Sequence, residues 1–151
     1  MRRKDRKIDN SEAIEILNKG EYGILSMVSL ESEGYGIPLN YAMEGNNIYF
    51  HCATEGTKLD YLKNNNKVSF CVVGKTELMP AKFGTKYESA IVFGITSDVG
   101  ENEKREGLWL LIKKYSADFT NQGDTYIDKY WDRVTILKLS IESISGKARK
   151  Q

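Results

Sequence analysis

The sequence predicts a mainly β fold, a closed or nearly closed antiparallel barrel of six strands with helices at its periphery. Three observations predict it. Six stretches of strand length are apolar or alternate between apolar and polar residues. The first three of them follow one another through short turns with no helix between, which disfavours a doubly wound parallel sheet. The helix-like segments, three or four in number, flank these stretches.

Length and composition limit the possible domain organisation and the classes of partner. At 151 residues the chain is expected to be a single domain covering 1–151, long enough for a real core. The net charge of +1 gives no reason to expect bulk attraction to nucleic acid or to a membrane surface. The exception is a basic N-terminal tail, residues 1–7, which has five basic residues in seven. We interpret it as a surface tail, with a nucleic-acid-binding arm as the alternative.

The first predicted helix covers residues 9–19. Asp9 can cap its N-terminus and Glu12 lies at the capping-box position. Lys19 suits the negative end of the helix dipole, and Gly20 is expected to end the helix in the left-handed conformation.

Strands are then predicted, one after another, at residues 22–30, 35–43, 48–53, 67–74, 87–99 and 133–144. The turns between the first three contain Gly or Asn, which accept positive φ, so these strands are expected to form a meander. Pro38 lies inside the second strand and cannot donate to a ladder, so that strand must be at an edge or bulged there. Either the free backbone groups bind a flat heterocycle, or Pro38 merely protects an edge.

Residues 49–67 contain the most informative local pattern. A strand carrying His51, the only histidine, runs into a polar loop that ends at Gly56, and an amphipathic helix with Lys58 in its first turn follows. A helix N-terminus presents N–H groups without intrahelical partners, and its dipole favours anions, so we expect a phosphate to bind here. The alternatives are an ordinary strand histidine and a solvated lysine.

The remaining segments are assigned from their patterns. Residues 75–86 are interpreted as a loop or irregular hairpin, residues 101–116 as the longest helix and residues 124–131 as a short helix. Residues 145–151 are predicted to be a polar, basic C-terminal tail.

Several classes of function are excluded by missing motifs. No Gly-rich triphosphate or dinucleotide motif follows a strand, no Ser nucleophile elbow occurs, and one histidine cannot build a His-rich metal site, so no metal is expected. No apolar run follows the basic tail or is long enough to span a bilayer. Cys52 and Cys71 lie in strand-like runs without metal spacing, which is typical of reduced thiols in a cytoplasmic protein.

The motifs together carry a resemblance to a known family. The run G-I-P-L-N-Y-A is followed by I-Y-F-H-C-A-T-E-G-T-K-L-D-Y-L and then by N-K-V-S-F-C-V. In this order they resemble the flavin-binding core of the pyridoxamine 5′-phosphate oxidase-like split-barrel superfamily, and more closely its nitroimidazole-resistance-related (Nim-type) branch. The resemblance covers residues 8–99 best; the Y-E-S-A-I-V-F-G stretch and the Tyr130–Trp131 pair also match in kind.

The resemblance implies a six-stranded split barrel, a homodimer, and FMN bound between the subunits. By position, a strand with backbone groups along the flavin ring would be formed by Pro38, Leu39, Asn40 and Tyr41. The ring and ribityl chain would be lined by His51, Cys52 and Ala53, and the phosphate held by Thr57 and Lys58. The partner subunit would contribute Tyr87, Ser89 and Trp131.

The functional hypothesis is therefore a cytoplasmic FMN-dependent oxidoreductase that reduces a small, electron-poor organic substrate, of the nitroimidazole type or similar, with NADH, NADPH or a reduced protein as electron donor. His51 is the expected proton donor or substrate contact, because no other side chain ordinarily titrates near neutral pH. The C-terminal S-G-K-A-R-K-Q does not match the substrate-phosphate motif of the pyridoxamine phosphate oxidases. The alternatives are a non-catalytic flavin or haem binder or sensor, and a cofactor-free β-barrel interaction module.

Overall fold

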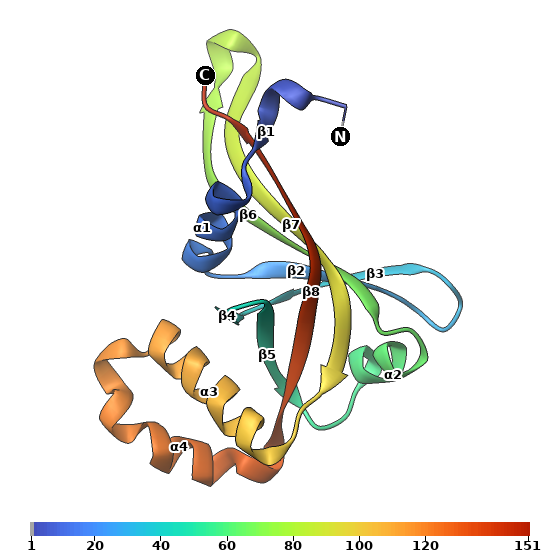
Figure 1. Cartoon of the computed structure of the whole chain (residues 1–151), viewed down its shortest axis with the longest axis vertical. Coiled ribbons are helices and arrows are strands. Elements are labelled where there is room, and N and C mark those ends of the chain that lie inside the picture. Colours follow the sequence, from blue (N-terminus) through green and yellow to red (C-terminus); the bar gives the residue numbers. More distant parts are fainter. Residues whose placement is uncertain (1) are drawn as a thin grey trace.

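A computed structural model describes residues 2–151. Its core is one eight-stranded antiparallel sheet in the order β3-β2-β6-β7-β8-β5-β4, with β1 paired to β8 (Figure 1). The strands are β1 (Lys7–Ile8), β2 (Gly23–Val28), β3 (Gly34–Leu39), β4 (Ala42–Glu44), β5 (Asn47–Ala53), β6 (Lys67–Met79), β7 (Gly84–Asp98) and β8 (Val134–Arg149). The helices are α1 (Asn10–Lys19), α2 (Thr57–Asn64), α3 (Glu101–Tyr115) and α4 (Gly123–Tyr130). The predicted class, an antiparallel split barrel with flanking helices, is confirmed. The sheet has eight strands where six were predicted, because β1 was not expected and the second predicted strand divides into β3 and β4.

The barrel is split between β3 and β4. These two strands are consecutive in the chain, yet they lie at opposite ends of the sheet. The prediction of one strand over residues 35–43, and of a three-stranded meander, was therefore wrong. The chain leaves the sheet at Asn40 because Tyr41 turns its ring into the core, where it is fully buried. The predicted edge position of Pro38 is confirmed, since β3 pairs only with β2.

β6 and β7 form a long, irregular hairpin over residues 75–86, the second of the two forms that the sequence predicted there. The strand pairing slips between Val73 and Thr76 and then continues to the pair Met79–Gly84. A bulge of this kind bends a strand without ending it, so the Gly and Lys residues there did not mark a loop. A short 3-10 turn at Pro80–Lys82 joins the two arms.

The predicted C-terminal tail, residues 145–151, is mostly strand. β8 continues to Arg149 by pairing with the start of β7 on one side and with β1 on the other. These pairings also order the end of the basic N-terminal segment, in which Lys4–Arg6 is a 3-10 turn; Met1 lies outside the described residues. Residues 145–149 are half-buried or buried although several of them are polar, and backbone pairing, which no side-chain pattern reveals, holds the strand in place.

α1 has the predicted N-terminus but a different end. The Asp9 carboxylate accepts a hydrogen bond from the Glu12 backbone N–H at 2.8 Å, as predicted for a cap. Gly20 is not left-handed, since its φ is −65°. A glycine is required for another reason: a Cβ there would lie 2.4 Å from Val72 Cγ1.

The barrel core is built around three aromatic rings. Phe70 packs edge-on against Tyr41 and Phe50, with ring centroids 4.8 Å and 5.0 Å apart, and none of the three is exposed. The Tyr41 hydroxyl donates a hydrogen bond to the Leu17 carbonyl, so burial of this polar group is compensated and α1 is tied to the barrel.

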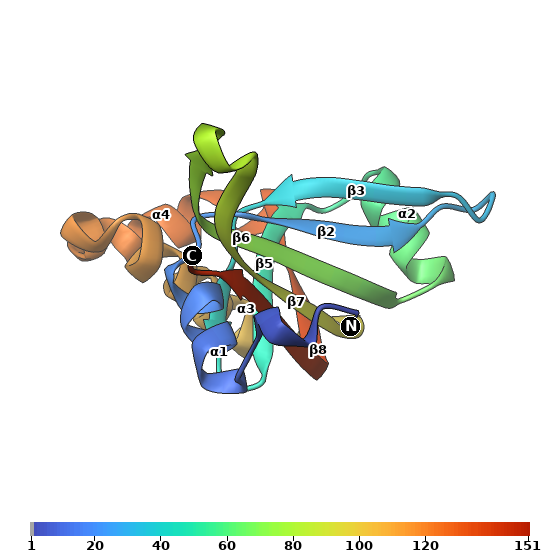
Figure 2. The same cartoon turned by 90° about the horizontal axis from the view of Figure 1, so that it is seen from above.

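α3 covers part of the outer face of β5 and β8. Leu111 packs there against Tyr49 and Ile136 in a second, smaller apolar cluster. At its edge the Tyr49 hydroxyl donates to Glu103, which also pairs with Lys138 at 2.8 Å. Figures 1 and 2 both show α3 and α4 on the side of the sheet opposite to α2. Within residues 2–151, no helix has the length and apolar character that crossing a membrane requires.

Candidate functional site

The candidate site begins at the end of β5, where side chains alternate between the two faces of the barrel wall. His51 and Ala53 point outward and are exposed, whereas Cys52 lies between them and is buried. Cys52 and the half-buried Cys71 are both free thiols. Of the three residues predicted to line a ring here, only His51 and Ala53 therefore present their side chains to the outer surface.

α2 begins directly after this strand. The turn depends on Gly56, whose φ of +136° is a conformation that other residues rarely adopt. Gly56 O accepts hydrogen bonds from the N–H groups of Leu59 and Asp60. The N–H groups of Thr57 and Lys58 precede the first intrahelical bond and are available to an anion at the helix N-terminus.

Lys58 is close enough to the strand end to change its electrostatics. Partial burial lowers the pKa of His51, and the Lys58 ammonium lowers it further. Burial raises the pKa of the Cys52 thiol, while Lys58 acts in the opposite direction. The imidazole is therefore neutral at pH 7, with one nitrogen able to accept a hydrogen bond and the other able to donate one.

This electrostatic coupling can be tested directly, because His51 gives the only imidazole signals of the chain. We expect an NMR titration to place its pKa below the ordinary 6.5, and Lys58→Ala to raise it. The exposed Lys63 of the same helix offers a matched control, and Lys63→Ala should leave the titration unchanged. Folding of the unaltered protein lowers the His51 pKa, so the unfolded chain binds this proton more tightly than the folded chain does. The free energy of unfolding should therefore fall as the pH drops through 6.5. An unchanged His51 pKa in Lys58→Ala would contradict the proximity of the two groups.

A cavity of about 170 Å³ adjoins His51. Its polar wall includes His51 from β5 and Asn40 from the junction of β3 and β4, two residues predicted to be in the site. The rest of the wall comes mostly from apolar and aromatic side chains of α3 and α4: Leu108, Leu111, Ile112, Tyr115, Tyr126, Ile127 and Tyr130. Such a space is smaller than the roughly 300–1,000 Å³ of sites for drug-sized ligands, so it can admit about one ring.

Tyr115 fixes the β3–β4 junction against α3. Its hydroxyl accepts a hydrogen bond from Tyr41 N at 3.0 Å and lies 2.6 Å from the Glu21 carbonyl, to which it can donate. The Lys114 ammonium lies 3.7 Å above the Tyr41 ring, and burial lowers the pKa of Lys114 to about 8. The Tyr41 backbone N–H, which was expected to face a flavin ring, is thus already bonded within the chain.

Removing this hydroxyl should loosen the junction. We expect Tyr115→Phe to lower the free energy of unfolding by about 1–3 kcal/mol, because Tyr41 N–H loses its acceptor. Chemical denaturation measures the change. Tyr126→Phe is the control, since this tyrosine lines the same cavity but is 59% exposed. Equal free energies of unfolding for Tyr115→Phe and Tyr126→Phe would argue against a role of the Tyr115 hydroxyl in holding the β3–β4 junction.

The structure does not bring all predicted residues together within one chain. His51 lines the same cavity as Asn40 and lies within electrostatic range of Lys58, and Pro38 and Leu39 lead to Asn40 along β3. The three residues expected from a partner subunit are elsewhere: Tyr87 and Ser89 are on β7, and Trp131 follows α4 beside Arg105. The Tyr87 hydroxyl accepts a hydrogen bond from Arg6, which lowers the pKa of Tyr87.

Sequence reasoning missed the cavity wall. Residues 101–116, which carry Leu108, Leu111, Ile112 and Tyr115, were predicted only as a helix. Nothing local in the sequence shows that part of this helix borders a space beside His51, since that depends on how α3 and α4 dock.

Comparison with known families supports the geometry. The model of the family described as pyridoxamine 5′-phosphate oxidase matches residues 9–148. The chain belongs to this family. The resemblance to the pyridoxamine 5′-phosphate oxidase family that the motifs indicated is confirmed. A search of the curated proteins found no match to the chain.

Solved structures share the fold of this family member. A candidate 5-nitroimidazole antibiotic resistance protein of Bacteroides thetaiotaomicron has a TM-score of 0.77 at 22% identity, over 94% of this chain and 86% of the other. An FAD and haem binding protein of Mycobacterium smegmatis scores 0.82 at 15% identity, over 97% and 74%. An FAD-binding protein of Mesorhizobium loti scores 0.67 at 19% identity, over 96% and 98%. At these identities the likenesses show the fold.

Proposed function

We propose that this protein is an FMN-binding flavoprotein, an oxidoreductase that reduces a small, flat, electron-poor organic molecule. The observation that carries the proposal is the cavity shared by Asn40 and His51, with Lys58 near enough to lower the pKa of His51. A ring-sized apolar space, a neutral imidazole and a cationic helix N-terminus thus occur side by side. Two of the solved relatives are described as binding FAD, which supports a flavin.

The residues present fit the phosphate end of FMN. Thr57 and Lys58 offer two backbone N–H groups, and their side chains add a hydroxyl and an ammonium. Lys58 forms no ion pair with another residue of the described chain, so its charge is available to a ligand. The exposed positions of Thr57, His51 and Ala53 leave this edge accessible. When bound, the flavin supplies the redox chemistry.

The cavity itself fits the substrate better than the cofactor. A tricyclic flavin ring exceeds a space of about 170 Å³, so we place the flavin on the outer edge by Asn40, His51 and Ala53. The tyrosines and leucines of α3 and α4 then hold one substrate ring and exclude water from it. His51 and Asn40 are the polar groups at the boundary, and we assign His51 to hold or donate a proton at the substrate.

We also propose that two copies of the chain associate through the outer face of β2, β6 and β7. Ile24, Val73, Ile91 and Phe93 are exposed there, at 37%, 58%, 37% and 54%. Cys71 pairs with both Ile24 and Ile91, so these side chains form one continuous strip. Water contact with such a strip is unfavourable, and a second copy would cover it. Tyr87 and Ser89 lie on the same face of β7 and would then approach the partner's flavin.

The second hypothesis is a non-catalytic flavin or haem binder, supported by the relative described as binding FAD and haem. Anaerobic mixing of the FMN-loaded protein with NADH or NADPH distinguishes a reductase from such a binder. Bleaching of the flavin absorption, and its return on adding a nitroaromatic compound, is expected of the reductase. If the flavin stays oxidised with both nicotinamides and with dithionite-reduced donor proteins, the protein is a carrier or sensor and not a reductase.

The two free cysteines fit a reducing, cytoplasmic compartment.

A further inference from the structure

The tip of the β6–β7 hairpin exposes apolar side chains that no other part of the described chain covers. Phe83 is 99% exposed and Leu78 is 76% exposed. Phe83 also has a φ of +46°, a conformation that costs energy for a residue other than glycine. A fully exposed aromatic ring in a strained turn has no role in folding the hairpin, which indicates a contact outside the chain.

The same arm is basic. Lys82 lies in the turn and Lys75 on the β6 arm, and neither has an ion-pair partner among residues 2–151. Lys86 is different, since it pairs with Glu77 across the hairpin at 3.2 Å. The arm therefore presents an aromatic tip with two free positive charges.

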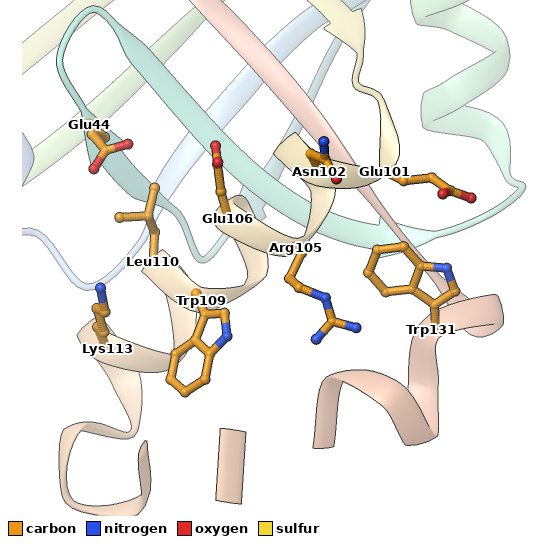
Figure 3. A pocket seen from close by; sticks show the side chains of 9 residues that line it. All are labelled: Glu44, Glu101, Asn102, Arg105, Glu106, Trp109, Leu110, Lys113 and Trp131. Atoms are coloured by element: carbon orange, nitrogen blue, oxygen red, sulfur yellow. The ribbon is translucent and has the colours of Figure 1, made fainter. Parts of the chain in front are cut away.

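A groove along α3 has the complementary character (Figure 3). Trp109 from α3 and Trp131 from the turn after α4 lie on either side of Arg105 in this view. The Trp109 indole N–H donates to Asp124 at 3.0 Å, and Arg105 is held by Asp124 and Asp128 at 3.2 Å and 2.5 Å. The Trp109 indole is thus fixed by Asp124, the Trp131 ring lies against the Lys104 and Arg105 cations, and both indoles are half-buried.

The groove is also acidic. Glu44, Glu101 and Glu106 line it, and none of them forms an ion pair within the described chain. Its cations are Lys113 and Arg105, and the charge of Arg105 is offset by two aspartates. The net charge of the lining is negative, opposite to that of the hairpin arm.

We propose that the β6–β7 tip of one copy docks into the α3 groove of a second copy. Figure 1 shows the tip and the α3–α4 pair at opposite ends of the long axis, so the tip cannot reach the groove of its own chain. A two-fold axis across the apolar strip of β2, β6 and β7 reverses one chain against the other and brings each tip toward the partner's α3. The contact is then made twice and reciprocally. This inference rests on the proposed pairing of two copies and adds the segment and groove that fix it.

Phe83 is the expected anchor. A buried aromatic side chain at such a contact commonly contributes most of the binding energy, so Phe83→Ala should raise the dimer dissociation constant at least about tenfold. Leu30→Ala is the matched control, because Leu30 is 57% exposed and lies on another turn. Sedimentation of the full chain over a range of concentrations measures both. Equal dissociation constants for Phe83→Ala and Leu30→Ala would overturn the proposal.

Charge reversal tests the groove independently of folding. Reversing the arm (Lys75→Glu with Lys82→Glu) or the groove (Glu101→Lys with Glu106→Lys) should each weaken the dimer, more so at low salt. Combining all four changes should restore it, since opposite charges again face each other. Failure of the combined variant to associate better than either pair alone would contradict the docking.

Two further readouts separate this proposal from others. Flavin absorption after FMN addition reports the proposed function, so a dimer that Phe83→Ala weakens but that takes up no FMN refutes only the flavin assignment. A chain that takes up FMN as a monomer refutes the docking.

Co-sedimentation with anionic phosphatidylserine vesicles tests whether the hairpin tip binds a lipid surface in place of a second copy. Vesicle binding that Phe83→Ala abolishes, with an unchanged dimer constant, would also overturn the docking.

Discussion

Lys58→Ala is expected to weaken FMN binding by roughly 10- to 100-fold, while riboflavin binding changes by no more than about twofold. The first figure corresponds to about 1.5–3 kcal/mol, the usual range for a hydrogen bond to a charged group. Riboflavin lacks the phosphate, so it does not engage the ammonium. Because Lys58 is only partly buried at the start of α2, its removal leaves the barrel core intact. Fluorescence quenching of each flavin measures the two affinities.

Lys63→Ala provides the control for this experiment. Lys63 is in the last turn of the same helix and is exposed, so the variant carries the same change in net charge without touching the helix N-terminus. Both flavins should bind it as they bind the unaltered protein. An equal loss of FMN and riboflavin affinity in Lys58→Ala would refute the phosphate assignment and indicate a general disturbance of the site.

Phe70→Ala should cause the largest loss of stability, about 3–5 kcal/mol of unfolding free energy. The Phe70 ring is fully buried on β6 and contacts both Tyr41 and Phe50, so its removal opens a cavity at the centre of the barrel. The neighbouring rings cannot fill it, because the Tyr41 hydroxyl is bound to the Leu17 carbonyl. The midpoint and slope of urea unfolding give the change.

Phe119→Ala is the comparison for Phe70. Phe119 is 61% exposed, so its loss should change the unfolding free energy by no more than about 0.5 kcal/mol. If Phe70→Ala does not fold, Phe70→Leu retains most of the volume and should show a smaller loss of stability. A loss below about 1 kcal/mol in Phe70→Ala would show that this ring is not central to the core.

The parts of the fold that could be predicted are those that local patterns determine. Strand alternation, the Asp9 cap and the edge position of Pro38 each follow from a few neighbouring residues. The separation of β3 from β4 could not be predicted, because it depends on Tyr41 finding its place between Leu17 and Phe70. These partners are distant in the sequence, so the apolar run alone resembled one continuous strand.

The strand nature of residues 145–149 was missed, and the choice between loop and hairpin at residues 75–86 stayed open, for a related reason. Polar and basic side chains are compatible with a strand whose order comes from backbone pairing with neighbours. Residues 145–149 of β8 pair with β1 and with the start of β7, both far from them in the sequence, so no local signal identifies these partners.

The candidate site also has a part that could be predicted from the sequence and a part that could not. His51, Gly56 and Lys58 lie within one strand–loop–helix unit, so their proximity could be inferred from spacing. Tyr115 reaches the β3–β4 junction from 74 residues away, and α4 contributes Tyr126 and Tyr130 to the cavity wall. Only the docking of α3 onto β5 and β8, and of α4 against α3, brings these residues to His51.

The central claim is that the edge formed by Asn40, His51 and the start of α2 holds FMN. Its most direct test is to add FMN to the purified, flavin-free chain and to record visible absorption after removing unbound flavin. The proposal predicts a flavin band that remains with the protein, in equal numbers of FMN molecules and chains, and that is released on denaturation. A protein that stays colourless after such treatment would contradict it.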